Sequence, residues 1–195
     1  MAPQGHNYPA QHLDSGSNPG PAGNRRPRSV SSAGDHGEMP VIALRPVADA
    51  DLDALFEQMR DPESVQMAAF TPEDPDDRAA FDAHMARVLS APGVTHRAVT
   101  CDGQLVGSIA AFVIDGETEV TYWIDRVAWG RGIASRALEL LLDLVPARPL
   151  YARAASDNAA SLRVLEKSGF QVIGTENSFA PARKASIEET ILRKE

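Results

Sequence analysis

The sequence has little capacity for cross-linking or for crossing a membrane. It contains one cysteine among 195 residues, Cys101, so no disulfide forms within the chain. No apolar run approaches the roughly 18 residues that a membrane-spanning helix needs, and the N-terminus lacks the apolar centre of a secretory signal. We therefore expect a cytoplasmic protein. Cys101 lies beside the turn-forming pair Asp102-Gly103, and we expect a small buried side chain there rather than a nucleophile.

Several common kinds of site are also missing. Neither His84 nor His96 has a partner at metal-ligand spacing, so we expect no metal site and interpret both histidines as structural. The sequence has no Ser/His/Asp signature, no phosphate-binding loop ending in Gly-Lys-Ser/Thr, and no aromatic–basic pattern typical of nucleic-acid binding. The net charge of −8 also argues against nucleic acid and suits a cationic substrate such as an amine. Acidity that only aids solubility explains this charge equally well.

Charge and composition divide the chain into two parts. Residues 1–38 carry three basic and three acidic side chains, so the whole net charge of −8 belongs to the remainder. This stretch is rich in Gly, Pro, Ser and Asn, and it cannot bury enough apolar surface to offset the entropy lost on ordering. We predict a disordered leader over residues 1–38 and one folded domain over residues 39–195. An upstream-start extension would explain the leader, with Met39 as the alternative start.

Turn signals and hydrophobic periodicity predict strands and helices after the leader. The predicted strands are residues 41–45, 96–100, 104–114, 117–125, 150–154, 170–176 and 186–192. The predicted helices are residues 50–60, 76–90, 132–144 and 159–167, and residues 63–69 are compatible with a further short helix. Because a helix joins strand 117–125 to strand 150–154, we expect these two strands to be parallel, with a right-handed crossover.

A glycine-containing turn lies between strand 117–125 and helix 132–144. Its sequence is Trp129-Gly130-Arg131-Gly132-Ile133-Ala134. Glycine lets the backbone approach a ligand closely, and the first turn of a helix presents free N–H groups and the positive end of the helix dipole. These features predict a site for an anion such as a pyrophosphate. The alternative is that the glycines only shape the turn.

The surroundings of this turn carry a family resemblance. The turn resembles the acetyl-CoA-binding segment of the GNAT N-acetyltransferases, in which Gln/Arg-x-x-Gly-x-Gly/Ala follows a central strand. Gly132 and Ala134 match the last two motif positions, and Trp129 stands where Gln or Arg is usual. The Trp-Gly-Arg-Gly run and the preceding Tyr-Trp-Ile-Asp run, at residues 122–125, resemble the branch of ribosomal-protein N-terminal (alanine/serine) acetyltransferases.

A second signature of that branch follows downstream. It consists of Asp157-Asn158-Ala159-Ala160-Ser161 and then Leu165-Glu166-Lys167-Ser168-Gly169-Phe170. Both signatures occur in order and at the right spacing, and the resemblance covers residues 41–195. It implies an α/β (α+β) fold: a GNAT-like mixed, mostly antiparallel twisted sheet of about seven strands with about four helices. In that fold the central strands are splayed to accept the CoA arm.

The resemblance also implies how acetyl-CoA binds as a cosubstrate, without a metal. The backbone around Trp123 and Ile124 would meet the pantetheine arm. The pyrophosphate would be wrapped by Trp129, Gly130, Arg131, Gly132, Ile133 and Ala134. Arg131 would add charge at the rim of this site, or alternatively be a solvated surface side chain. Asn158 would bind the pantetheine amide, cap helix 159–167, or do both, and Ser156 and Asp157 are the other candidates for that cap.

Acetyl transfer from a thioester to an amine needs a neutral amine, a donor to the oxyanion and a donor to the departing thiolate. Many relatives use a tyrosine for the last task, at the position that Leu165 occupies here. The branch resembled implies Ser161 as the donor to the sulfur; alternatively, Ser161 satisfies a free N–H of the first helical turn. Glu119 would take the amine proton through water, although its place outside the apolar alternation favours a surface charge.

Two functions from different classes follow. The first is transfer of an acetyl group from acetyl-CoA to a primary amine, on a protein N-terminus or a small molecule, by direct attack in a ternary complex. The second is a non-catalytic domain that binds acyl-CoA as a sensor or interaction module, which Leu165 keeps open. The resemblance also implies that the first two helices wall the acceptor pocket. We expect a monomer or homodimer with an amine acceptor as its partner, and neither nucleic acid nor membrane.

Overall fold

The computed structural model describes residues 40–195, so the predicted leader and Met39 lie outside the described residues. The described chain forms a seven-stranded sheet with the strand order β1-β2-β3-β4-β5-β7-β6. The strands are β1 (Ile42–Pro46), β2 (Thr95–Cys101), β3 (Gln104–Ile114), β4 (Glu117–Ile124), β5 (Leu150–Ala155), β6 (Gln171–Ala180) and β7 (Ala185–Lys194). The α-helices are α1 (Leu52–Met59), α2 (Pro62–Ala68), α3 (Arg78–Ser90), α4 (Ile133–Leu144) and α5 (Ala159–Lys167).

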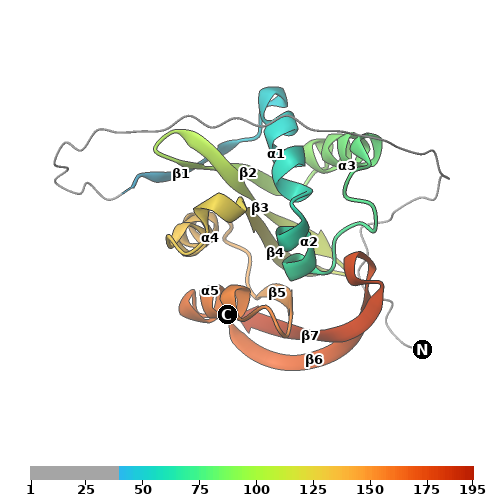
Figure 1. The fold of residues 1–195 in the computed structure, drawn as a ribbon. Helices are drawn as coiled ribbons and strands as arrows, with labels where there is room; N and C mark the ends of the chain where they lie inside the picture. Colours follow the sequence, from blue (N-terminus) through green and yellow to red (C-terminus); the bar gives the residue numbers. More distant parts are fainter. Residues whose placement is uncertain (1–39) are drawn as a thin grey trace, which may run out of the picture.

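Helices cover both faces of this sheet (Figure 1). Helices α1, α2 and α3 lie on one face, and α4 and α5 lie on the other. Within residues 40–195, neighbouring strands are antiparallel except for β4 and β5, which are parallel and joined through α4. The predicted fold class is therefore confirmed, and the segment compatible with a further short helix forms α2.

The main core lies between the sheet and α4. Apolar residues recur along α4 at helical spacing, and Ala137, Leu138 and Leu141 are fully buried by it. They pack against inward-facing residues of the strands, among them Ile109. Cys101 belongs to the same cluster with 5% of its surface exposed, as expected for a small buried side chain.

The last hairpin is longer than predicted. Strand β6 continues to Ala180, whereas the hydrophobic pattern predicts an end at residue 176. The extra residues alternate between buried Ser178 and exposed Phe179, which is opposite to the polar-out pattern that sequence reasoning uses. A short 3-10 turn, Pro181–Arg183, then leads into β7.

The sheet opens in its middle, between β4 and β5. These strands pair at two positions only, Thr118 with Leu150 and Glu119 with Tyr151. Strand β4 continues for five residues beyond its last paired residue, to Ile124, without pairing with β5. The predicted splay of the central strands is thus present, and it leaves one edge of β4 facing a gap.

Gly107 on β3 pairs with Ile124 at the end of β4 and allows the two strands to lie close together there. Its φ is +154°, and a Cβ atom there would lie 2.0 Å from the backbone oxygen of Trp123. Only glycine allows the two strands to approach so closely. Strand β3 therefore supports β4 along the stretch where β5 has separated from it.

Candidate active site

The first turn of α5 stands at the gap between β4 and β5. Strand β5 ends at Ala155, four residues beyond its last pair with β4, and α5 begins at Ala159. Ser161 Oγ lies 2.7 Å from the phenolic oxygen of Tyr122 on β4. The backbone oxygen of Ser161 lies 3.3 Å from the same phenol. The predicted catalytic serine is therefore hydrogen-bonded across the gap to the opposite strand.

Asn158 is the N-cap of α5. Its side-chain oxygen accepts a hydrogen bond from the Ser161 backbone N–H at 3.0 Å, and its Nδ2 donates to the Met67 carbonyl of α2 at 3.4 Å. The alternative caps, Ser156 and Asp157, are wrong, because the Ser156 hydroxyl is bonded to a β7 threonine and Asp157 is in an ion pair. Binding of the pantetheine amide by Asn158 stays a prediction.

Arg183 ties α2 to the start of α5. Its guanidinium donates to the Gln66 carbonyl at 2.8 Å and to the Met67 carbonyl at 3.4 Å, at the end of α2. The same group forms a two-point ion pair with Asp157 at 2.6 and 3.1 Å. One side chain from the β6–β7 connection thus positions α2 beside the gap.

The glycine turn leads directly into α4. Gly130 and Gly132 have φ values of +74° and +75°, and a Cβ atom at either would meet no atom within 4 Å. Their requirement is therefore conformational, and the space beside the backbone is open. Gly132 is the N-cap of α4, so the N–H groups of Ile133, Ala134 and Ser135 have no partner within the helix. An exposed turn with free N–H groups at the start of a 12-residue helix fits a phosphate.

The indole N–H groups of both tryptophans of the motif donate hydrogen bonds to backbone carbonyls. Trp123 Nε1 donates to a backbone carbonyl of α1 at 3.0 Å. Trp129 Nε1 donates to the Ile124 carbonyl at 2.7 Å and so fixes the turn against the end of β4. Arg131 is exposed, and its guanidinium lies 3.6 Å from Cys101 Sγ. All these residues lie near the gap or the turn, but their contact with acetyl-CoA stays a prediction.

Glu119 is buried, so its interpretation as a surface charge is wrong. Its side chain is 9% exposed, and Oε1 accepts a hydrogen bond from Arg153 Nε at 3.1 Å. Arg153 also pairs with Glu176 and, at 3.8 Å, with Glu189. Three carboxylates from three strands therefore surround one guanidinium. Arg153, on the neighbouring strand β5, offsets the free-energy cost of burying the charge of Glu119.

Burial also changes the acidity of this group. It raises the pKa of the Glu189 carboxyl to about 7, against the lowering effect of the Arg153 cation. The Glu189 side chain is 10% exposed, and the Ser178 hydroxyl lies 3.5 Å from its carboxylate. At neutral pH this carboxyl is therefore partly protonated.

Ser161 and Glu119 face the gap from opposite sides of the sheet. Val120 and Tyr122 pack with the core beneath α4, so Glu119, one position away, points to the α1–α2 face. Ser161 contacts Tyr122 and thus lies on the α4–α5 face. Ser161 and Glu119 therefore lie on opposite faces of the sheet, beside the gap.

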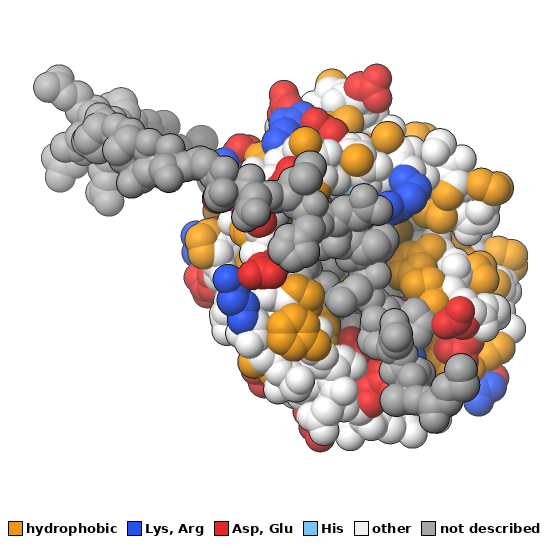
Figure 2. All heavy atoms as spheres, turned by 90° about the vertical axis from the view of Figure 1, so that its right-hand side faces the viewer, with side chains coloured by type: hydrophobic (Ala, Val, Ile, Leu, Met, Phe, Trp, Pro, Cys, Tyr) orange, Lys and Arg blue, Asp and Glu red, His pale blue; other side chains and the backbone are white. Residues whose placement is uncertain are grey.

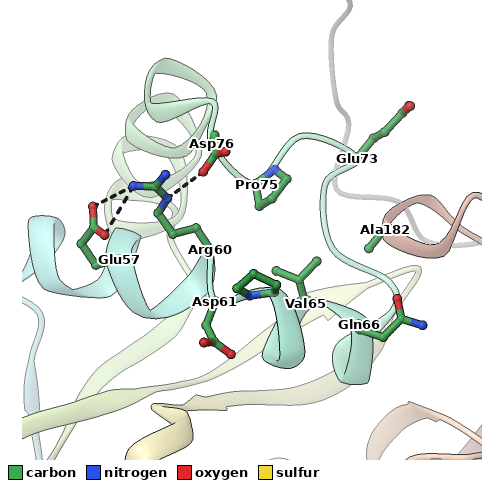
Figure 3. A pocket seen from close by; sticks show the side chains of 10 residues that line it. Glu57, Arg60, Asp61, Val65, Gln66, Glu73, Pro75, Asp76 and Ala182 are labelled. Carbon is green, nitrogen blue, oxygen red and sulfur yellow. Dashed lines mark hydrogen bonds and ion pairs between the residues drawn. The ribbon is translucent and has the colours of Figure 1, made fainter. Parts of the chain in front are cut away.

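A groove of about 560 Å³ lies on the α1–α2 side (Figure 3). It is lined by Glu57, Arg60, Asp61, Pro62, Val65, Gln66, Glu73, Pro75, Asp76 and Ala182. Four of these residues carry carboxylates and one carries a guanidinium. Arg60 lies between two of the acids, 2.6 Å from Asp76 and 3.2 Å from Glu57. Asp61 and Glu73 pair with cations outside the lining, Arg126 at 3.1 Å and Lys184 at 3.0 Å. Acids therefore outnumber bases in the lining itself, but each acid has a cationic partner.

The right-hand side of the molecule in Figure 1 faces the viewer in Figure 2. Figure 2 shows Lys and Arg side chains scattered there among acidic and hydrophobic ones.

The described residues also lack a metal-binding cluster. Within residues 40–195, no group of three or more His, Cys, Asp and Glu residues is placed to hold a metal ion. Burial lowers the pKa of His84 to about 4, with Arg87 adding to the effect. Burial likewise lowers the pKa of His96. Both imidazoles are neutral at pH 7.

Sequence reasoning missed three residues that shape this site. They are Tyr122, Arg153 and Arg183. Tyr122 lies within the motif itself, and its polar tip on the apolar side of β4 is the signal that could have identified it. Arg153 interrupts the apolar residues of its strand in a similar way. Nothing in the sequence near Arg183 indicates the carbonyls to which it binds.

Comparison with known proteins decides the family. The sequence profile described as "Acetyltransferase (GNAT) domain" matches residues 42–171, about two thirds of the chain. The chain belongs to the GNAT acetyltransferase family. A curated relative is the uncharacterized N-acetyltransferase p20 of Bacillus licheniformis, which is 26% identical over 157 residues. That match covers 75% of this GNAT chain and 88% of the relative.

Solved structures share the fold of this GNAT acetyltransferase. The microcin C7 self-immunity acetyltransferase MccE, in complex with acetyl-CoA and AMP, has a TM-score of 0.67 and 16% identity. The match covers 78% of this chain and 91% of MccE. An acetyltransferase from Salmonella typhimurium that modifies the N-terminal serine of ribosomal protein L7/L12 has a TM-score of 0.65 and 16% identity, with coverages of 78% and 94%.

Family membership defines the general reaction. This GNAT protein is an acetyl-CoA-dependent N-acetyltransferase, which moves the acetyl group of acetyl-CoA to an amine. Family membership thus favours the acetyltransferase hypothesis over a non-catalytic acyl-CoA sensor. Across residues 40–195, every helix is too short or too polar to cross a lipid bilayer.

Proposed function

We propose that this GNAT acetyltransferase acetylates a primary amine, on a protein N-terminus or a small molecule, by direct attack in a ternary complex. The observation that carries the proposal is the gap between β4 and β5. Ser161 lies at one face of this gap, and Glu119 is buried at the other. A thioester and an amine can then approach one point from opposite sides, which replaces a bimolecular encounter by a positioned one.

Acetyl-CoA would lie on the α4–α5 side. In this arrangement the pyrophosphate is held by Trp129, Gly130, Arg131, Gly132, Ile133 and Ala134. The pantetheine arm runs along the unpaired edge of β4 near Trp123 and Ile124 and reaches Asn158. The open space at the two glycines and the free N–H groups of α4 support this placement.

Two side chains would serve the chemical step. The neutral amine attacks the thioester carbon, and the C–S bond then breaks with its electron pair on sulfur. Ser161 donates a hydrogen bond to that sulfur, and Glu119 takes the amine proton through a water molecule. Arg153 donates a hydrogen bond to Glu119 Oε1 at 3.1 Å and so fixes the orientation of this carboxylate.

The acceptor is proposed to carry positive charge before it is deprotonated. The groove beside α1 and α2, whose lining holds four carboxylates and one guanidinium, lies on the acceptor side, and an incoming ammonium group could compete for these carboxylates. An N-terminal amine is the acceptor of the Salmonella typhimurium relative, and a small polyamine offers the same chemistry. Both belong in the test.

The direct test uses full-length protein, acetyl-CoA and paired amines. Peptides that begin with Ser or Ala are compared with the same peptides already acetylated at the N-terminus, and a polyamine is added to the panel. We expect free thiol and acetylated product in equal amounts from at least one unblocked amine, and neither from blocked peptides. Thiol release at background with every amine would contradict the proposal.

Ser161→Ala tests the assigned role of the serine. A hydrogen bond to a developing charge is worth about 1.5–3 kcal/mol, so we expect turnover to fall roughly ten- to a hundred-fold while acetyl-CoA affinity stays unchanged. Ser168→Ala, at the other end of α5, is the matched control and should keep full turnover. Wild-type turnover in Ser161→Ala, or equal losses of turnover and affinity, would show a structural or binding residue instead.

A further inference from the structure

The hydroxyl groups of Tyr122 and Ser161 form a pair whose chemistry the assigned roles leave unexplained. Their oxygens are 2.7 Å apart, a short hydrogen bond for two hydroxyls. Tyr122 is partly buried and packs against the main core, with its hydroxyl reaching the first turn of α5. The pair therefore connects the two sides of the gap.

The direction of this bond decides what Ser161 can do. A serine hydroxyl has one hydrogen and two acceptor sites. If Ser161 donates to Tyr122, that hydrogen is unavailable to a thioester sulfur. If Tyr122 donates to Ser161 Oγ, the serine hydrogen is free to point elsewhere.

Three observations favour Tyr122 as the donor. A phenol is more acidic than an aliphatic hydroxyl and is the stronger hydrogen-bond donor, whereas serine oxygen is the better acceptor. The competing acceptor for the phenol, the Ser161 carbonyl, is farther away at 3.3 Å. The backbone N–H of Ser161 already donates to Asn158 Oδ1. Ser161 Oγ therefore does not have to accept that hydrogen and is free to accept one from Tyr122.

Burial keeps the phenol in its donor form. It raises the pKa of Tyr122 to about 12, while the bond to Ser161 acts in the opposite direction. A thiol has a pKa of about 8.5, so a departing thiolate is too weak a base to take the phenolic proton. Both O–H bonds therefore stay intact, and the two hydroxyls act as a polarised chain of hydrogen bonds.

Leu165 cannot donate a hydrogen bond to Ser161 or to the sulfur, because its side chain has no polar group. It stands where many relatives carry a tyrosine, but here it is 1% exposed and packed within the main core. The phenol near Ser161 instead comes from β4, a strand that borders the gap.

We propose that Tyr122 is a positioning residue for acetyl transfer, donating its phenolic hydrogen bond to Ser161 Oγ and so aiming the serine hydrogen at the thioester sulfur. This inference rests on the proposed role of Ser161. When the C–S bond breaks, sulfur keeps the electron pair, Ser161 hydrogen-bonds to it, and Tyr122 supports the partial charge that this leaves on Oγ. Tyr122 itself contacts neither substrate.

The test is a double-mutant cycle read in separate kinetic constants. Tyr122→Phe removes only the hydroxyl, and we expect kcat to fall roughly five- to thirtyfold with the acetyl-CoA Kd unchanged. In a Ser161→Ala background, the same change should cost less than about twofold, because the hydroxyl that it orients is gone. Tyr151→Phe is the matched control on β5, where the ring lies 6.0 Å from the Arg193 guanidinium, and should retain wild-type kcat.

The outcomes separate this inference from the proposed function. If Ser161→Ala retains full turnover, the assigned role of Ser161 fails and this inference fails with it. If Ser161→Ala is slow but Tyr122→Phe is not, only this inference is overturned. A Tyr122→Phe loss that persists undiminished in the Ser161→Ala background would show a structural hydroxyl and would also overturn it.

A second measurement covers the case in which Tyr122→Phe disturbs folding. A fluorinated tyrosine incorporated at position 122 keeps the hydroxyl and makes the phenol more acidic, hence a stronger donor. We expect kcat to rise, with the acetyl-CoA Kd unchanged. An unchanged or lower kcat would mean that Tyr122 does not donate to Ser161.

Discussion

Two opposing effects act on the pKa of the Glu189 carboxyl: burial disfavours its ionised form, and the Arg153 cation favours it. Its ionised form is poorly hydrated, since only 10% of the side chain is exposed, and it shares Arg153 with Glu119 and Glu176. The resulting pKa of about 7 lies above that of a free glutamate. The folded protein therefore holds a proton at pH 5–7 that the unfolded chain has released.

This difference makes stability depend on pH in a known direction. Since the folded-state pKa is raised, the stabilisation is present at low pH and is lost as pH rises through about 7. Glu189→Gln cannot ionise, so it should gain stability relative to wild type between pH 5 and pH 8, by on the order of 2 kcal/mol. Thermal melts across this pH range measure the difference.

Glu188→Gln is the control for that comparison. Glu188 is exposed and precedes Glu189 on β7, so its replacement should leave the pH profile parallel to wild type. A Glu189→Gln profile that also stays parallel would show that Glu189 ionises normally in the folded protein.

Individual side-chain environments were the hardest feature to predict from the sequence. Glu119 interrupts the apolar alternation of its strand, and local reasoning assigns such a charge to the surface. Its partner Arg153 lies 34 positions away, and the Tyr122–Ser161 bond spans 39 positions. Contacts at such separations depend on how strands are ordered in the sheet, which periodicity does not encode.

Regular elements were predictable because their signals are local. Helices α4 and α5 follow from apolar spacing, and their observed bounds, Ile133–Leu144 and Ala159–Lys167, lie within one residue of the predicted ones. The identity of the N-cap of α5 could not be predicted in this way, since Ser156, Asp157 and Asn158 are all good capping residues. Tertiary bonds to the first two leave Asn158 to cap the helix.

The glycine turn and the start of α4 act together as one proposed phosphate site. Gly132→Asp would put a negative side chain where the pyrophosphate is expected. Acetyl-CoA at about 100-fold above its Kd should stabilise the wild-type protein by about 2.7 kcal/mol, because it binds only the folded state. We expect this shift in melting temperature to be absent from the variant.

Gly116→Asp provides the matched comparison for that experiment. Gly116 also has a positive φ, +86°, and open space around it, but it lies in the β3–β4 turn. It should show the same intrinsic strain as Gly132→Asp and a full acetyl-CoA shift. If Gly132→Asp retains the shift too, the phosphate lies elsewhere.

For the chain as a whole, the folded domain and the leader should behave independently. The composition of residues 1–38 predicts a segment that contributes no packing, and the net charge of −8 resides in the rest. Removing residues 1–38 should therefore leave the melting temperature and the acetyl-CoA affinity nearly unchanged. Calorimetry on both forms tests this, and a loss of more than a few degrees would show that the segment packs on the domain.

The gap between β4 and β5 has a consequence for hydrogen exchange. One edge of β4 is paired with β3 along its whole length, whereas the other edge is paired with β5 at two positions only. Amide hydrogens on the gap edge beyond Glu119 should therefore exchange quickly with solvent deuterons. If the pantetheine arm occupies this edge as a strand would, saturating acetyl-CoA should slow exchange there more than on β2, which is paired on both sides. Equal slowing on both strands would mean that acetyl-CoA stiffens the whole domain without pairing along β4.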